Sequence, residues 1–96
     1  MRGVRLVIQF TADSTETADK AIEAAVERCK KASQEPGCLQ FEVFRSALQP
    51  HKYVLLEHWE SKDALAVHAQ GMAGNPPRPN PGVTRVREDY EYNQTS

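Results

Sequence analysis

The sequence predicts an α+β fold, in which a four-stranded antiparallel sheet carries two helices on one face. Three observations predict it. Apolar side chains alternate at residues 4–10, as in a half-buried strand, and a long helical repeat follows. Two further strand-like segments flank a short central loop, and a second helical segment precedes a last strand. The order β-α-β-β-α-β is the split β-α-β arrangement.

The spacing of apolar residues predicts both the first strand and the first helix. One face of the strand is apolar: Val4, Leu6, Ile8 and Phe10. The opposite face carries Arg5, Val7 and Gln9. Asp13 or Ser14 then caps a helix, with Glu16 in the capping-box position relative to Asp13. Its apolar residues recur at helical spacing: Ala18, Ile22, Ala25, Val26, Cys29 and Ala32. The helix should therefore bury a stripe of mostly small side chains.

A turn and a hairpin occupy the centre of the chain. Glu35-Pro36-Gly37 ends the helix, because proline restricts the residue before it and glycine allows the backbone angles of a tight turn. Residues 38–45 and 53–60 are rich in aromatic and branched side chains, and residues 47–52 form the loop between them. Leu39, Phe41 and Val43 are expected on one face of the second strand. These features predict two antiparallel strands.

The last third of the chain holds the second helix and the last strand. Ser61 should cap a short helix that ends near residues 71–74. Its inner face is predicted to carry Leu65, His68, Ala69 and Met72. Residues 75–82 contain four prolines, which exclude helix and central strand and predict a stiff extended loop. Residues 83–92 resume a strand pattern, and residues 93–96 are expected to fray as a tail.

Both faces of the predicted sheet carry large apolar side chains. On the third strand, Val54 and Leu56 alternate with Tyr53, Leu55 and Trp59. A sheet with one face in water shows cleaner polar alternation than this. Since both helices cover one face, a second copy of the same sheet is the simplest cover for the other. The sequence therefore predicts a homodimer.

Composition narrows the class of protein. The chain has 96 residues, enough for a single domain over residues 1–96, with 40% hydrophobic and 26% charged residues. The net charge is −1 and the basic residues are spread along the chain, so we expect no nucleic-acid partner. No apolar run approaches the roughly 20 residues of a membrane span, and no secretory signal is visible, so we expect no membrane partner and a cytoplasmic location. Cysteine and histidine spacings predict no bound metal.

The central third of the chain resembles the antibiotic biosynthesis monooxygenase (ABM) domain family. The residues that carry the resemblance are Glu35-Pro36-Gly37-Cys38-Leu39-Gln40-Phe41-Glu42-Val43, Tyr53-Val54-Leu55-Leu56-Glu57-His58-Trp59-Glu60-Ser61-Lys62-Asp63-Ala64-Leu65 and His68. The resemblance implies a ferredoxin-like dimeric α+β barrel with a pocket between helices and sheet. Family members include cofactor-independent monooxygenases of anthrones and quinols, an isomerase of a furanone phosphate, and haem-degrading oxygenases.

The second helix departs from the family pattern after His68. The family reads Ala-Leu-x-x-His-x-x-Ser-x-His-Phe there, and this chain matches it at Ala64, Leu65 and His68 only. The second histidine, which is the iron ligand in the haem-degrading branch, would fall in the proline-rich segment around Arg78. That branch also uses an asparagine on the first strand, and residues 4–10 contain none. The resemblance thus argues against haem, and no cofactor is expected.

Among the ionisable side chains, His68 is the best candidate for catalysis. Neutral imidazole accepts a proton near physiological pH, which suits a base that deprotonates a substrate. The alternative is that His68 bonds to a buried carbonyl and only packs. Glu57 either has a raised proton affinity on a partly buried face or pairs with Arg45 across the hairpin. A closed cavity at His68 of about 300 Å3 or more would favour a ligand site.

Other side chains are candidates for substrate binding. Trp59, with Tyr53 and Phe44, is predicted to form a wall for a flat aromatic ligand, or else to belong to the core or the dimer contact. Arg5 and Gln9 either orient a polar group of the ligand or face solvent. Two functions remain open: a monooxygenase without metal or flavin that acts on an aromatic or quinol-like molecule, and a non-catalytic binding or dimerisation domain of the same fold.

Overall fold

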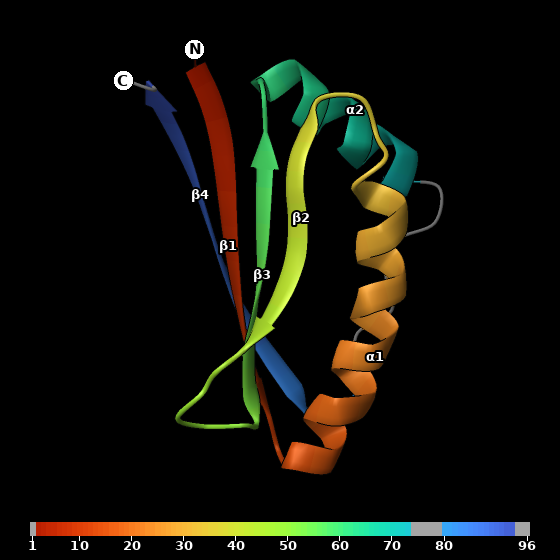
Figure 1. The fold of residues 1–96 in the computed structure, drawn as a ribbon, viewed down its shortest axis with the longest axis vertical. Helices are drawn as coiled ribbons and strands as arrows, with labels where there is room; N and C mark the ends of the chain where they lie inside the picture. The colour runs from red at the N-terminus through yellow and green to blue at the C-terminus, as the bar shows by residue number, and fades with distance from the viewer. Residues whose placement is uncertain (1, 74–79, 94–96) are drawn as a thin grey trace.

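The strands form one antiparallel sheet in the order β2-β3-β1-β4, and both helices lie on one face of it (Figure 1). The structure is a computed structural model that describes residues 2–73 and 80–93. The elements run β1 (Arg2–Ala12), α1 (Thr15–Ala32), β2 (Cys38–Arg45), β3 (Lys52–Trp59), α2 (Lys62–Ala73) and β4 (Val83–Asn93). The predicted β-α-β-β-α-β fold is confirmed.

Helix α1 begins where Ser14 caps it. The Ser14 Oγ accepts a hydrogen bond from the Thr17 N–H at 3.1 Å, so Ser14, and not Asp13, is the cap. The buried stripe is Ala18, Ala21, Ala25, Cys29 and Ala32. Val26 was predicted to lie in this stripe, but it is 36% exposed, because it follows Ala25 by about 100° around the helix. Small side chains allow α1 to lie close to the sheet.

The turn after α1 docks on the start of α2. Gly37 has a φ of +81°, which other residues rarely adopt. A Cβ atom added at Gly37 would lie 2.5 Å from the Cβ of Ala64, so the turn and α2 are in close contact. The Glu60 N–H also donates to the Gly37 carbonyl at 2.9 Å. The turn is thereby fixed to the segment that joins β3 to α2.

A bulge changes the facing of residues in β2. Cys38 pairs with Trp59, but Gln40 pairs with the adjacent His58, so Leu39 is the extra residue. Leu39 was predicted to share the inner face with Phe41, yet it is 50% exposed. Strand β3 begins and ends one residue earlier than predicted, and the predicted β2 bounds are confirmed.

Helix α2 and strand β4 complete the described chain. The Ser61 Oγ accepts from the Ala64 N–H at 3.1 Å, which confirms the predicted cap. His68 is buried as predicted, whereas Ala69 was predicted on the same face and is exposed. Asn93 was expected in a frayed tail but pairs with Arg2 in the sheet. Residues 74–79, most of the predicted proline-rich loop, and the tail at 94–96 lie outside the described residues.

The core lies between the sheet and the helices, in two clusters. The cluster near α2 contains Val4, Leu6, Cys29, Ala32, Phe41 and Trp59. The other contains Ala12, Ala18, Ala21 and Tyr53. Trp59 is 0% exposed and Leu6 is 2% exposed, and these two are the largest fully buried side chains among the described residues. The cluster near α2 borders His68.

The opposite face of the sheet carries apolar side chains among polar ones, and no described element covers it (Figure 1). We call this the outer face. Its apolar side chains are Val7, Phe44, Val54, Leu56, Val86 and Tyr90. Phe44 is 42%, Tyr90 51% and Val86 61% exposed. Over residues 2–73 and 80–93, neither helix has the length and apolar content that a membrane crossing requires.

Candidate functional site

His68 is held between two aromatic rings and one carboxylate. It is 9% exposed, and its ring centroid lies 4.8 Å from that of Trp59 and 5.6 Å from that of Phe41. Its Nδ1 lies 2.7 Å from the Oε2 of Glu35. Because a carboxylate only accepts hydrogen bonds, the imidazole donates from Nδ1. The partner of His68 is therefore a side-chain carboxylate and not a main-chain carbonyl.

Glu57 lies in the core beside this group. It is 5% exposed and accepts a hydrogen bond from the indole N–H of Trp59 at 3.0 Å. Burial raises the pKa of Glu57 above its usual value, although the Trp59 hydrogen bond and the charge on His68 oppose the shift. The prediction of a raised proton affinity is thus confirmed. The alternative, a pair with Arg45, is wrong, because the Arg45 guanidinium binds Asp19 at 2.6 Å.

Replacing Glu57 by glutamine is expected to improve stability relative to wild type as the pH rises. The folded state binds the Glu57 proton more tightly than the unfolded chain, whose carboxyl titrates near pH 4.3 at about its reference value. The contribution of this proton to the free energy of unfolding is fully present below the pKa of Glu57 in the unfolded chain. It is lost as the pH rises through the pKa of Glu57 in the folded protein. Glu57→Gln has no such proton to lose.

The measurement is the free energy of urea unfolding of both proteins between roughly pH 4 and pH 8. Glu23→Gln, on the exposed side of α1, is the matched control, for which we expect a smaller change. A difference between Glu57→Gln and wild type that does not vary with pH would contradict the assignment of a buried carboxylate.

The structure separates the other predicted binding residues from His68. Tyr53 is on the inner face, but it lies six positions before Trp59 on β3, about 20 Å along the strand, and stacks on Phe10. Phe44, Arg5 and Gln9 lie on the outer face. These four side chains therefore do not share a site with His68, and of the predicted wall only Trp59 contacts it.

A second polar cluster lies at one end of the outer face. The Arg5 Nη1 donates to the Gln40 Oε1 at 3.3 Å, and its guanidinium lies 5.8 Å from the centroid of the Tyr92 ring. The Tyr92 hydroxyl and the His58 Nε2 form a hydrogen bond. Burial, with a smaller effect of Arg5, lowers the pKa of His58. Neither histidine outside α2 had been given a role from the sequence.

Glu35 is the site residue that the sequence did not reveal. It was interpreted only as part of the turn that ends α1. It is 33 positions from His68 in the chain, and no local periodicity links two residues so far apart. The signal lay in the turn itself, since Gly37 permits a close approach to α2. Among residues 2–73 and 80–93, no three histidine, cysteine or acidic side chains gather as a metal site requires.

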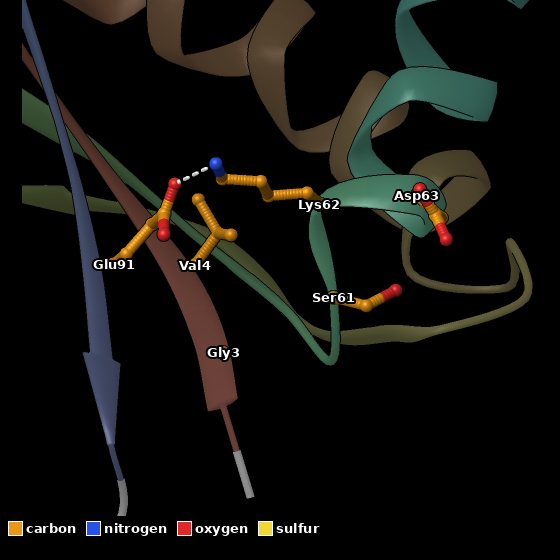
Figure 2. Close-up of a pocket in the computed structure, with 6 residues that line it drawn as sticks. All are labelled: Gly3, Val4, Ser61, Lys62, Asp63 and Glu91. Atoms are coloured by element: carbon orange, nitrogen blue, oxygen red, sulfur yellow. Dashed lines mark ion pairs between the residues drawn. The ribbon is translucent and has the colours of Figure 1, made fainter.

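Two surface hollows can be described, and His68 lines neither. One of about 230 Å3 lies between the ends of β1 and β4 and the start of α2, where the Lys62 Nζ reaches the Glu91 Oε1 at 2.5 Å (Figure 2). The other, of about 250 Å3, is bordered by Thr17, Lys20, Ala21, Asn80 and Pro81. Neither hollow meets the expectation of a preformed cavity at His68.

A family model identifies the family of this chain, and solved structures share its fold. The profile of the family described as antibiotic biosynthesis monooxygenase matches residues 3–73. A crystal structure from Bacteroides thetaiotaomicron, of a conserved protein of unknown function described as a possible oxidoreductase, is 26% identical. It has a TM-score of 0.74, and the match covers 94% of this chain and 97% of that one.

Two more distant structures share the fold. The haem degrader MhuD from Mycobacterium tuberculosis, with two haems in its active site, is 22% identical, with a TM-score of 0.70 and coverage of 97% of this chain and 98% of that one. SnoaB, a cofactor-independent oxygenase from Streptomyces nogalater, is 19% identical, with a TM-score of 0.64 and coverage of 97% and 95%. A search of curated proteins found no match.

Proposed function

The chain belongs to the antibiotic biosynthesis monooxygenase family, and from this premise we propose that it is a small monooxygenase that uses neither metal nor flavin. The proposed substrate is an aromatic, quinol-like molecule. The observation that carries the proposal is a buried imidazole, His68, that is oriented through Nδ1 and has no hydrogen-bond partner at Nε2 among the described residues. An imidazole held in this way is suited to accept a proton.

The proposed reaction begins with proton removal. His68 takes a proton from an acidic C–H or O–H of the substrate, and the resulting electron-rich anion gives one electron to O2. Superoxide and the substrate radical combine to a peroxide. Cleavage of its O–O bond leaves one oxygen atom as a carbonyl and releases the other as water, with a proton returned from His68. For a methylene substrate the balance is R2CH2 + O2 → R2CO + H2O.

The charges around His68 favour a neutral substrate. Glu35 is within hydrogen-bond distance of the imidazole, and Glu57 is buried close enough to interact electrostatically with it. An anionic ligand, such as a phosphate ester, would be repelled by these carboxylates. The rings of Trp59 and Phe41 beside the imidazole offer aromatic surface to a flat molecule. We therefore place a neutral phenol, anthrone or quinol at this site.

The experiment is oxygen uptake by the purified protein with a panel of anthrones, naphthols and dihydroquinones, in the presence of a metal chelator and without flavin. We expect at least one substrate to consume oxygen faster than its autoxidation rate. Product formed equally fast without oxygen would instead indicate isomerisation. The absence of turnover across the panel would contradict the proposed activity.

A second candidate function is a non-catalytic dimerisation or binding domain. The observation that favours it is that neither described hollow borders His68. On this account the family fold is retained for pairing of chains, and His68 and Glu35 only join α2 to the turn. Ligand titrations distinguish the two, because a catalytic site must bind panel compounds and a dimerisation domain need not.

The outer face supports a homodimer in either case. We propose that two copies pack their outer faces together, because six apolar side chains gather there and no described element covers them. Several large apolar side chains exposed on one face are typical of an interface. Pairing would remove Phe44 and Tyr90 from water, which is the driving force for association.

Val54→Lys tests the proposed interface. Val54 lies on the outer face, paired with Gln9 on one side and Phe44 on the other. A lysine there would place a charge in the interface, so we expect the dimer dissociation constant to rise by roughly tenfold or more. Leu48→Lys, at a position 89% exposed in the hairpin loop, is the control and should leave the dimer intact. Sedimentation at micromolar concentration measures both, and a monomeric wild type would contradict the interface.

A further inference from the structure

We propose that Glu35 is the positioning residue of His68, fixing its imidazole as the Nδ1–H tautomer so that Nε2 is the atom that accepts the substrate proton. The inference rests on the proposed role of His68 as the base. It adds a residue from the turn between α1 and β2 to a site otherwise built from α2, β2 and β3. It also specifies which nitrogen faces the chemistry.

The geometry of the pair determines the tautomer. The Nδ1 of His68 and the Oε2 of Glu35 are 2.7 Å apart, a short distance typical of a bond to an ionised group. The carboxylate has no proton to donate when ionised, so Nδ1 carries the hydrogen in both the neutral and the charged imidazole. In the neutral form the free lone pair is then on Nε2.

Glu35 is itself held on both sides by main-chain hydrogen bonds. Its N–H donates to the Ala32 carbonyl at 3.0 Å, and its carbonyl accepts from the Cys38 N–H at 3.1 Å. Two positions later, Gly37 contacts α2 and accepts from the Glu60 N–H at 2.9 Å. The turn is thus fixed to the helix that carries His68. The main chain of Glu35 therefore has a fixed place relative to His68, from which its side chain reaches the imidazole.

The other nitrogen of His68 remains available. Nε2 has no hydrogen-bond partner among the described residues. Within residues 2–73 and 80–93, every fully buried side-chain nitrogen or oxygen has a partner, so Nε2 is not sealed from its surroundings. An imidazole bound at one nitrogen, flanked by the rings of Trp59 and Phe41 and open at the other nitrogen, is arranged as an oriented base.

Orientation and tautomer are the contributions of Glu35 to the site. The Glu35 side chain is 37% exposed, so water screens its charge, and the directed hydrogen bond to Nδ1 is what acts on His68. If Glu35 only fixed the turn, its replacement would change neither the orientation nor the tautomer of the His68 imidazole.

The first experiment observes the tautomer and needs no substrate. In 15N-histidine-labelled protein at roughly pH 9, where an imidazole is neutral, we expect His68 to show a protonated Nδ1 and an unprotonated Nε2. Glu35→Ala and Glu35→Met both remove the acceptor, and Met retains side-chain volume in case the alanine variant unfolds. Both should shift the tautomer toward Nε2–H. Glu23→Ala on the exposed side of α1 is the control. The same tautomer in wild type and both Glu35 variants would overturn the proposal.

The second experiment measures kinetics on any substrate that wild type turns over. We expect kcat to fall roughly tenfold or more in Glu35→Met, with KM changed far less, because orientation of the base matters in the transition state. Wild-type kcat in a folded Glu35→Met would overturn the proposal. If no protein turns over a substrate but the tautomer shifts as expected, the positioning role stands and only the proposed monooxygenase function fails.

Discussion

Replacing Trp59 by alanine is expected to destabilise the protein by about 3–5 kcal/mol, the range for removal of a large buried aromatic side chain. Trp59 is 0% exposed and belongs to the cluster that contains Val4, Leu6 and Phe41. Its loss leaves a cavity at the centre of that cluster and removes the ring beside His68. Total stabilities of single domains are about 5–15 kcal/mol, so this change alone approaches unfolding.

Trp59→Phe separates packing from hydrogen bonding. Phenylalanine keeps an aromatic ring in the core but lacks the indole N–H that donates to Glu57. We expect Trp59→Phe to lose less stability than Trp59→Ala. About 1–3 kcal/mol of the loss in Trp59→Phe reflects the Glu57 carboxyl, which is left buried without its hydrogen-bond donor. Urea unfolding at neutral pH measures both variants. A loss below roughly 1 kcal/mol for Trp59→Ala would show that the tryptophan is not a core residue.

Replacing His68 by alanine is expected to lower kcat by about 100- to 10,000-fold on any substrate the wild type oxidises, the usual contribution of a general base. The variant removes the proton acceptor and leaves Trp59, Phe41 and the outer face in place. The dimer should therefore persist, and KM should change much less than kcat. Oxygen uptake under identical conditions gives both constants.

His58→Ala is the matched control for this experiment. His58 directly precedes Trp59 on β3. Its side chain therefore lies on the other face of the sheet, where it forms a hydrogen bond with Tyr92. We expect it to retain wild-type kcat. Equal rates in wild type and a folded His68→Ala would remove His68 from the mechanism, and with it the role proposed for Glu35.

Much of the fold could be predicted because its signals are local. Two-residue alternation placed Val4, Leu6 and Ile8 on the inner face, and all three are buried. The Pro36-Gly37 turn and the Ser61 cap were equally local, and both are confirmed. The bulge at Leu39 was missed, because it arises from pairing between β2 and β3 and leaves no mark in the sequence of either strand.

The candidate site was predictable only in part. Glu57, Trp59 and His68 meet because strand alternation and helix periodicity each direct them to the same layer. Alternation also places Arg5 and Gln9 on the outer face of β1, away from the layer that contains His68. Glu35 could not be found this way, because its contact with His68 depends on how the turn docks on α2 and not on any repeat.

The measurement that tests the central claim most directly is oxidation of a panel substrate under 18O2 by wild-type protein free of metal and flavin. If the protein is a cofactor-independent monooxygenase, the product gains one labelled oxygen atom, and the rate depends on protein concentration. A product without the label, or a labelled product that forms no faster than without protein, would contradict the claim.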